Sequence, residues 1–130
     1  MKSAAQRFEE GKQKGNGESK MNLQEIGREA HEINTGNGWD GFTPTDWPSD
    51  EDKEKVRFAC THMALVHTEV SEATEAIRHR DRENFDEELA DVIIRVASIA
   101  HGLGTDLEAA ITAKLAKNRT RGLHHGGKAV

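Results

Sequence analysis

Two pairs of carboxylate residues are the strongest candidates for chemistry in this sequence, Glu69 with Glu72 and Glu88 with Asp91. The members of each pair are three positions apart, so on a helix both side chains lie on the same face and can point at one spot. Carboxylate oxygens are the hard ligands that Mg²⁺ and Mn²⁺ prefer. The spacing therefore predicts an acidic cage for a divalent cation, shared by two successive helices.

The sequence around these pairs predicts about four main helices and no strand. Capping residues and glycine stops indicate a first helix from Asn22 to Gly36, a second from Ser49 to about Arg78, a third from Asn84 to Gly102 and a fourth that begins at Thr105. No segment shows the sustained alternation of apolar and polar residues that a half-buried strand would show. Short connections favour antiparallel neighbours, so we expect an all-α fold, an antiparallel helical bundle.

Apolar residues at helical spacing predict the faces by which the second and third helices pack. The two rows are Ala59, Met63, Val66, Val70, Ala73 and Ile77, and Phe85, Leu89, Val92, Val96, Ile99 and Leu103. Each carboxylate lies one position before a residue of its row, so both pairs should border the seam between the helices and face each other. Two unit charges about 4 Å apart repel by roughly 4 kcal/mol at an effective dielectric constant of ~20, which calls for a compensating cation.

Two other interpretations compete with the cage. The carboxylates could be solvated helix acids, with Asp91 forming an ordinary ion pair with Arg95 four positions later. A di-iron carboxylate bundle would also gather acidic residues, but it requires Glu-x-x-His motifs on two helices. No glutamate of this sequence has a histidine three residues later, which disfavours the di-iron alternative.

The composition limits the fold and the partners. The 130 residues suffice for one domain with a modest core, which favours a homo-oligomer, a dimer or a tetramer. Lys and Arg total 18 against 23 Asp and Glu, and the formal charge of −5 argues against binding a long nucleic-acid polymer. The apolar stretch from Val92 to Leu103 is shorter than the ~20 residues of a membrane span. With a lone Cys60 and no secretory signal at the start, we expect a soluble cytoplasmic protein.

The ends of the chain complete the predicted organisation. We expect residues 1–20 to be a mobile extension, residues 21–121 the helical domain and residues 122–130 a C-terminal phosphate-binding tail. Lys114 and Asn118 share one face of the fourth helix, and Arg121 and Lys128 follow, so these side chains could bind phosphate oxygens. The competing interpretation is a basic helix end that complements the helix dipole and frays into solvent.

This order of features resembles the MazG-like family of all-α nucleoside triphosphate pyrophosphohydrolases, which includes dimeric dUTPases and dCTP pyrophosphatases. The matching elements are Glu69-Val-Ser-Glu72, Glu88-Leu-Ala-Asp91, Lys114-x-x-x-Asn118-x-x-Arg121 and Gly126-Gly127-Lys128. Two details depart from the family pattern. Thr68 stands where many members have the first of two adjacent glutamates, and Gly122 follows Arg121 where proline is common.

The resemblance implies Mg²⁺-dependent hydrolysis, with Mn²⁺ as the other candidate ion, between the α- and β-phosphates of a nucleoside or deoxynucleoside triphosphate. The products would be the monophosphate and pyrophosphate, in a house-cleaning role for the nucleotide pool. The resemblance assigns metal binding and catalysis to four carboxylates: Glu69, Glu72, Glu88 and Asp91. One of them would accept the proton of the attacking water. Phosphate binding falls to Lys114, Asn118, Arg121 and Lys128, acting in their own or a neighbouring subunit.

Trp39, and after it Trp47, is the candidate surface for stacking of the base, since aromatic faces accept any base. Core packing explains either tryptophan equally well. The alternative function is a non-catalytic helical module that senses a nucleotide or binds a protein partner through the same groove. Turnover of a triphosphate would distinguish the enzyme from this non-catalytic module.

Overall fold

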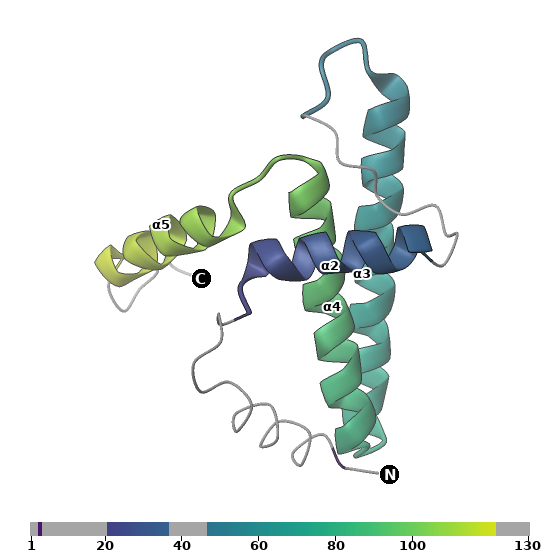
Figure 1. The fold of residues 1–130 in the computed structure, drawn as a ribbon. Coiled ribbons are helices and arrows are strands. Elements are labelled where there is room, and N and C mark those ends of the chain that lie inside the picture. Colours follow the sequence, from purple (N-terminus) through teal and green to yellow (C-terminus); the bar gives the residue numbers. More distant parts are fainter. Residues whose placement is uncertain (1–2, 4–20, 37–46, 122–130) are drawn as a thin grey trace.

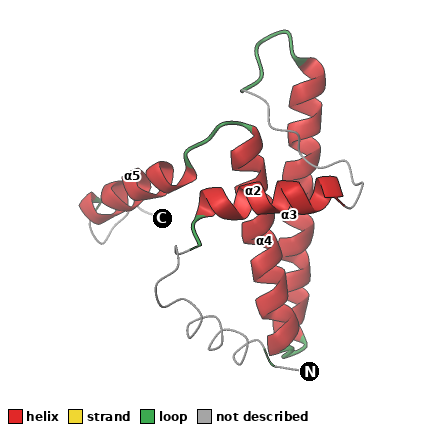
Figure 2. Cartoon of the chain, viewed as in Figure 1, coloured by secondary structure: helices red, strands yellow, loops and turns green. Residues whose placement is uncertain are grey.

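The computed structural model describes residue 3, residues 21–36 and residues 47–121 of the chain. Within these residues the fold is entirely helical and contains no strand (Figure 2), which confirms the predicted all-α class. The helices are α2 (Leu23–Gly36), α3 (Lys53–Arg78), α4 (Arg82–Gly102) and α5 (Leu107–Thr120). None of these helices is long and apolar enough to cross a membrane.

Helices α3 and α4 form an antiparallel pair that is the centre of the described fold (Figure 1). α2 lies across this pair and makes most of its contacts with α4. Gly27 permits the close crossing, because a Cβ atom at this position would lie 2.5 Å from the carbonyl oxygen of Ala97. α5 points away from the pair after the turn at Gly104 and buries none of its residues (Figure 1).

Local hydrogen bonds decide where each helix begins. The predicted cap of α2 is confirmed, since the backbone N–H of Glu25 donates to Oδ1 of Asn22 over 2.9 Å. The predicted start of α3 at Ser49 is wrong. The carboxylate of Asp52 accepts from both the N–H and the hydroxyl of Ser49, at 3.0 Å each, and closes a turn before the helix begins at Lys53.

The starts of α4 and α5 are also displaced from the predicted capping residues. Asp81, not Asn84, caps α4 by accepting a hydrogen bond from the N–H of Asn84 over 3.0 Å. Asp106, not Thr105, caps α5 in the same way through the N–H of Ala109. At both helix starts, an aspartate and a nearby Asn or Thr can act as the N-cap, and the aspartate forms the capping hydrogen bond.

The buried row of α3 differs from the predicted row by one position. Ala73 is buried as predicted, but Val70 and Ile77 are 48% and 54% exposed, so the prediction is wrong for them. Their preceding residues, Glu69 and Ala76, are buried instead. Small side chains at Ala73, at Ala76 and at Ala97 on α4 line the buried interior, where they allow close packing. On α3, the larger side chains of Val56, Met63, Val70 and Ile77 are exposed.

The displaced apolar residues form a regular exposed stripe. Val56, Met63, Val70 and Ile77 recur every seven residues along α3 and are all exposed. On α4, Ile99 is buried as predicted, whereas Leu89 is exposed and that part of the prediction is wrong. Helical periodicity places residues seven apart on nearly the same line, so the stripe is one continuous apolar face of α3.

Candidate metal centre and adjoining cavity

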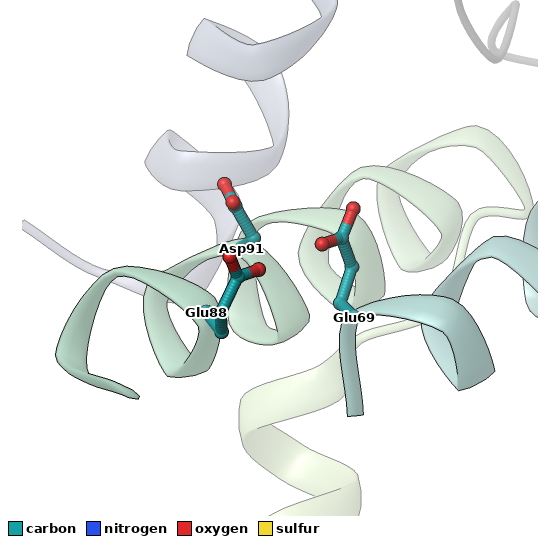
Figure 3. Close-up of side chains that lie close together, drawn as sticks. All are labelled: Glu69, Glu88 and Asp91. Carbon is teal, nitrogen blue, oxygen red and sulfur yellow. The ribbon is translucent and has the colours of Figure 1, made fainter. Parts of the chain in front are cut away.

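Three of the four predicted carboxylates converge across the seam between α3 and α4. Glu69 projects from α3, Glu88 and Asp91 project from α4, and all three turn to the same side (Figure 3). One oxygen from each lies within 4.8 Å of the others, close enough to share one cation. The convergence confirms that the two acidic segments face each other, although Glu69 lies within the seam rather than beside it.

Glu69 is the most enclosed of the three carboxylates, at 8% exposure. Nε of Arg95 donates a hydrogen bond to Oε1 of Glu69 over 2.6 Å, linking α4 to α3. Burial of Glu69 opposes ionisation, but the hydrogen bond and charge of Arg95 outweigh it and hold the pKa of Glu69 below its usual range. The competing interpretation paired Arg95 with Asp91 on one helix, but the recorded ion pair of Arg95 is with Glu69 across the seam.

Glu88 has a large pKa shift. Its partial burial, followed by its contacts with the Glu69 and Glu72 carboxylates, raises the pKa of Glu88 to about 7. Oε2 of Glu88 is buried and has no hydrogen-bond partner among the described residues. Burial, and then the charge of Glu69, also raise the pKa of Asp91. The metal-free cluster therefore holds more negative charge than its own surroundings neutralise.

A divalent cation fits this donor set. The oxygens are hard ligands, and the buried Oε2 of Glu88 lacks the partner that a buried polar atom normally has. Mg²⁺ and Mn²⁺ accept such carboxylate ligands together with water and phosphate oxygens. Glu72 is exposed and outside the compact group of three, although it lies close enough to Glu88 to raise the pKa of Glu88.

The raised pKa of Glu88 predicts a pH-dependent stability of the metal-free protein. Folding raises this pKa from 4.5 to about 7, so between these values the folded protein binds more protons than the unfolded chain. The contribution of Glu88 to stability is therefore lost as the pH rises through this window. Glu88→Gln stays neutral, so the Tm of this variant should exceed that of the wild type by an amount that grows from pH 5 to pH 7.5.

Thermal unfolding in the presence of a chelator measures this difference. His62, whose pKa shift does not involve Glu88, contributes equally to the stability of both proteins. Millimolar Mg²⁺ should abolish the advantage of Glu88→Gln, because the cation stabilises the ionised carboxylate of the wild type. A Tm difference that stays constant over the pH range would contradict the electrostatic assignment of Glu88.

A cavity of about 580 Å³ adjoins the acidic cluster. It lies among α2, α3 and α4, with Glu69 and Asp91 in its wall and apolar side chains such as Leu65 and Ile94 beside them. Asn34 from α2 and His62 from α3 add hydrogen-bonding groups. The volume falls in the range of small-molecule sites, and the mixed lining is typical of them.

His62 is suited to hydrogen bonding in its neutral form. Its burial, and then the positive charge of Arg95, lower the pKa of His62. The ring of Phe58 packs against the imidazole with ring centres 4.5 Å apart. A neutral imidazole has one donor and one acceptor nitrogen, and the Asn34 amide has both functions as well. Asn34 and His62 therefore contribute polar atoms to a wall that is otherwise partly apolar.

The predicted substrate-binding residues that the structure describes lie outside the cavity lining. Lys114, Asn118 and Arg121 are exposed at α5, and none of them lines the cavity beside the carboxylates. Trp47 is 71% exposed and also lies outside the cavity lining. Trp39 and Lys128 fall outside the described residues, as do the predicted tail and all of the predicted extension except residue 3. In the described part of one chain, the acidic and the cationic halves are not brought together.

Sequence reasoning gave no role in the site to three residues: Arg95, His62 and Asn34. Two of them carry a recognisable signal. His62 precedes Glu69 by seven positions, and Arg95 follows Asp91 by four, so each shares a helix face with a predicted ligand. Asn34 comes from a separate helix, and only the crossing of α2 over the pair brings it to the cavity.

Comparison with known proteins gives one match. The family model of the MazG nucleotide pyrophosphohydrolase domain matches residues 59–125, which is just over half of the chain. The matched span includes all four predicted carboxylates and the whole of α4 and α5. No curated protein and no solved structure matches the chain significantly.

Proposed function

Because the chain belongs to the MazG nucleotide pyrophosphohydrolase family, we propose that it hydrolyses a nucleoside triphosphate between the α- and β-phosphates, giving the monophosphate and pyrophosphate. The observation that carries this proposal is the convergence of Glu69, Glu88 and Asp91 beside a cavity large enough for a nucleoside. A triphosphate substrate is also the reason to place the activity in the cytoplasm.

The carboxylates are proposed to hold one or more Mg²⁺ ions, with Mn²⁺ as a substitute. Such an ion neutralises phosphate charge and lowers the pKa of a bound water. Glu69 and Asp91 lie in the wall of the cavity, so a cation that they hold would be placed to orient the reacting phosphate toward the water. Glu72, which is exposed at the edge of the cluster, completes the proposed ligand set once phosphates are present.

We assign the nucleoside to the cavity. A base entering between α2 and α3 would meet Asn34 and His62, which together offer donors and acceptors to its polar edge, and Leu65 and Ile94, which offer apolar contact. The neutral state of His62 matters here, since it allows one ring nitrogen to accept while the other donates. Trp47, which lies outside this lining, and Trp39, which lies outside the described residues, are kept as proposed stacking surfaces.

The phosphate-binding residues are proposed to act on a neighbouring subunit. Lys114 and Asn118 lie on α5, and Arg121 is its C-cap; this helix buries none of its residues and points away from the α3 and α4 pair (Figure 1). Together with Lys128 they would supply positive charge and hydrogen bonds to the phosphates. An oligomer that docks α5 beside the acidic cluster of another copy would unite the two halves of the site.

The stripe of Val56, Met63, Val70 and Ile77 is the proposed contact with that second copy. A chain of this size with no large side chain fully buried among its described residues gains stability by covering such a stripe. Repetition every seven residues suits helix-to-helix packing, which a twofold axis makes self-complementary. We propose a homodimer, or a tetramer built from such dimers.

Val70→Asp should convert the oligomer to a monomer, because it places a charge at the centre of the stripe. Light scattering after gel filtration measures the mass, and circular dichroism checks that the helices persist. Ser71→Asp introduces the same charge at the adjacent exposed position and should leave the mass unchanged. A wild type that is already monomeric, or a Val70→Asp variant with the wild-type mass, would refute this contact.

A panel of nucleoside triphosphates tests the proposed function. Canonical, oxidised and deaminated nucleotides are incubated with the protein and Mg²⁺ or Mn²⁺, and pyrophosphate is measured. The proposal expects pyrophosphate from at least one substrate, and a preference for altered nucleotides would support a house-cleaning role. Binding of nucleotides without any turnover would favour the non-catalytic sensing or interaction module instead.

A further inference from the structure

Arg95 stands apart from the other cations of the described chain. Its ion pair with Glu69 joins residues 26 positions apart on two helices, over 2.6 Å. The other ion pairs recorded among the described residues join positions three or four apart in sequence. Exposed ion pairs between neighbouring residues of a helix contribute little to stability. Breaking an ion pair to a buried carboxylate is strongly destabilising.

The position of Arg95 coincides with the place where a cation would bind. Glu69 is one of the three carboxylates whose oxygens gather within 4.8 Å, and its Oε1 accepts the Arg95 hydrogen bond. An oxygen that is held by a guanidinium is less available to a metal, and two positive charges at one carboxylate repel each other. Metal binding and the Arg95 ion pair therefore compete.

On the basis of the proposed function, we propose that Arg95 is a displaceable counter-ion, which neutralises Glu69 in the metal-free protein and is released toward the cavity when the divalent cation binds. Two features support the release. The Arg95 side chain is 37% exposed, so it is free of the close enclosure that holds Glu69. Arg95 also lines the cavity wall together with His62 and Asp91.

Release would give the guanidinium a second role in the same site. A planar guanidinium binds phosphate oxygens through two parallel hydrogen bonds, and the substrate brings these oxygens to the carboxylate cluster. Arg95 would then be a positioning residue that exchanges a carboxylate for a phosphate. The exchange keeps the charge of the site balanced before and after the cation and the substrate arrive.

Calorimetric titration of the metal-free protein with Mn²⁺ separates this role from a structural one. Removing an ordinary partner that orients a metal ligand weakens metal binding about 10- to 100-fold. Removing a cation that competes with the metal should instead strengthen metal binding. Arg95→Gln should therefore bind Mn²⁺ more tightly than the wild type, by about three- to tenfold. Arg82→Gln, which removes a charge paired with Asp86 on the same helix, should leave the Kd unchanged.

Arg95→Lys keeps the charge but shortens the side chain and weakens its contact with Glu69, so its Mn²⁺ affinity should lie between those of the wild type and Arg95→Gln. This variant decides the matter if Arg95→Gln does not fold. Unchanged or weaker Mn²⁺ binding in the folded variants, or a wild type that does not bind Mn²⁺, overturns the inference. Tighter Mn²⁺ binding without turnover of any triphosphate supports it and refutes the proposed function alone.

Discussion

Asp91→Asn should lower kcat for triphosphate hydrolysis roughly 100-fold or more, because it removes a charged ligand from the cluster. Asp91 is the carboxylate that both joins the group of three and lines the cavity from α4. The substitution keeps the size of the side chain and relieves repulsion from Glu69, so the Tm of the metal-free variant should not fall. Pyrophosphate release at saturating substrate measures the effect.

Asp86→Asn is the matched control for this prediction. It makes the same chemical change on the same helix, at a residue paired with Arg82 outside the cluster and the cavity lining. Its kcat should stay within about twofold of the wild type. Equal activity of Asp91→Asn and the wild type would remove the acidic cluster from the mechanism.

A dimer of two inactive chains should recover about half of the wild-type activity if α5 acts on the neighbouring subunit. One chain carries Asp91→Asn, the other carries Lys114→Ala with Asn118→Ala, and two affinity tags select the mixed dimer. One of its two sites then combines an intact acidic cluster with an intact α5. The expectation follows from the separation of α5 from the carboxylates within the described chain.

The reverse pairing provides the control. A dimer of a wild-type chain with a chain that carries all three substitutions has the same composition, but each of its shared sites contains a damaged half. This dimer should be nearly inactive if the sites are shared. Activity in this dimer and none in the first would place α5 in the site of its own chain.

The helices and the acidic cluster could be predicted from sequence because their signals are local. Asn22 caps α2, Gly104 ends the turn after α4 with φ +69°, and carboxylates three apart share a face wherever a helix forms. The antiparallel order of α3 and α4 follows from their short connection. These features together bring Glu69 opposite Glu88 and Asp91.

The rotation of α3 could not be predicted in the same way. Val70 and Glu69 both belong to rows with helical spacing, and hydrophobicity favours Val70 as the buried one. Which of the two is buried depends on tertiary contacts. Ala73 and Ala76 pack in the interior with Ala97, and Arg95 neutralises the carboxylate of Glu69 within the seam. A pairing across 26 positions leaves no local signal. The exposure of Val70 and Ile77 fits the proposed contact with a second copy.

Phosphorus NMR of one triphosphate substrate in water enriched in oxygen-18 tests the central claim most directly. With Mg²⁺, the resonances of a nucleoside monophosphate and of pyrophosphate should grow in equal amounts, with the label in the monophosphate, because water attacks the α-phosphorus. Formation of a diphosphate and inorganic phosphate, or a label found in pyrophosphate, would contradict the account.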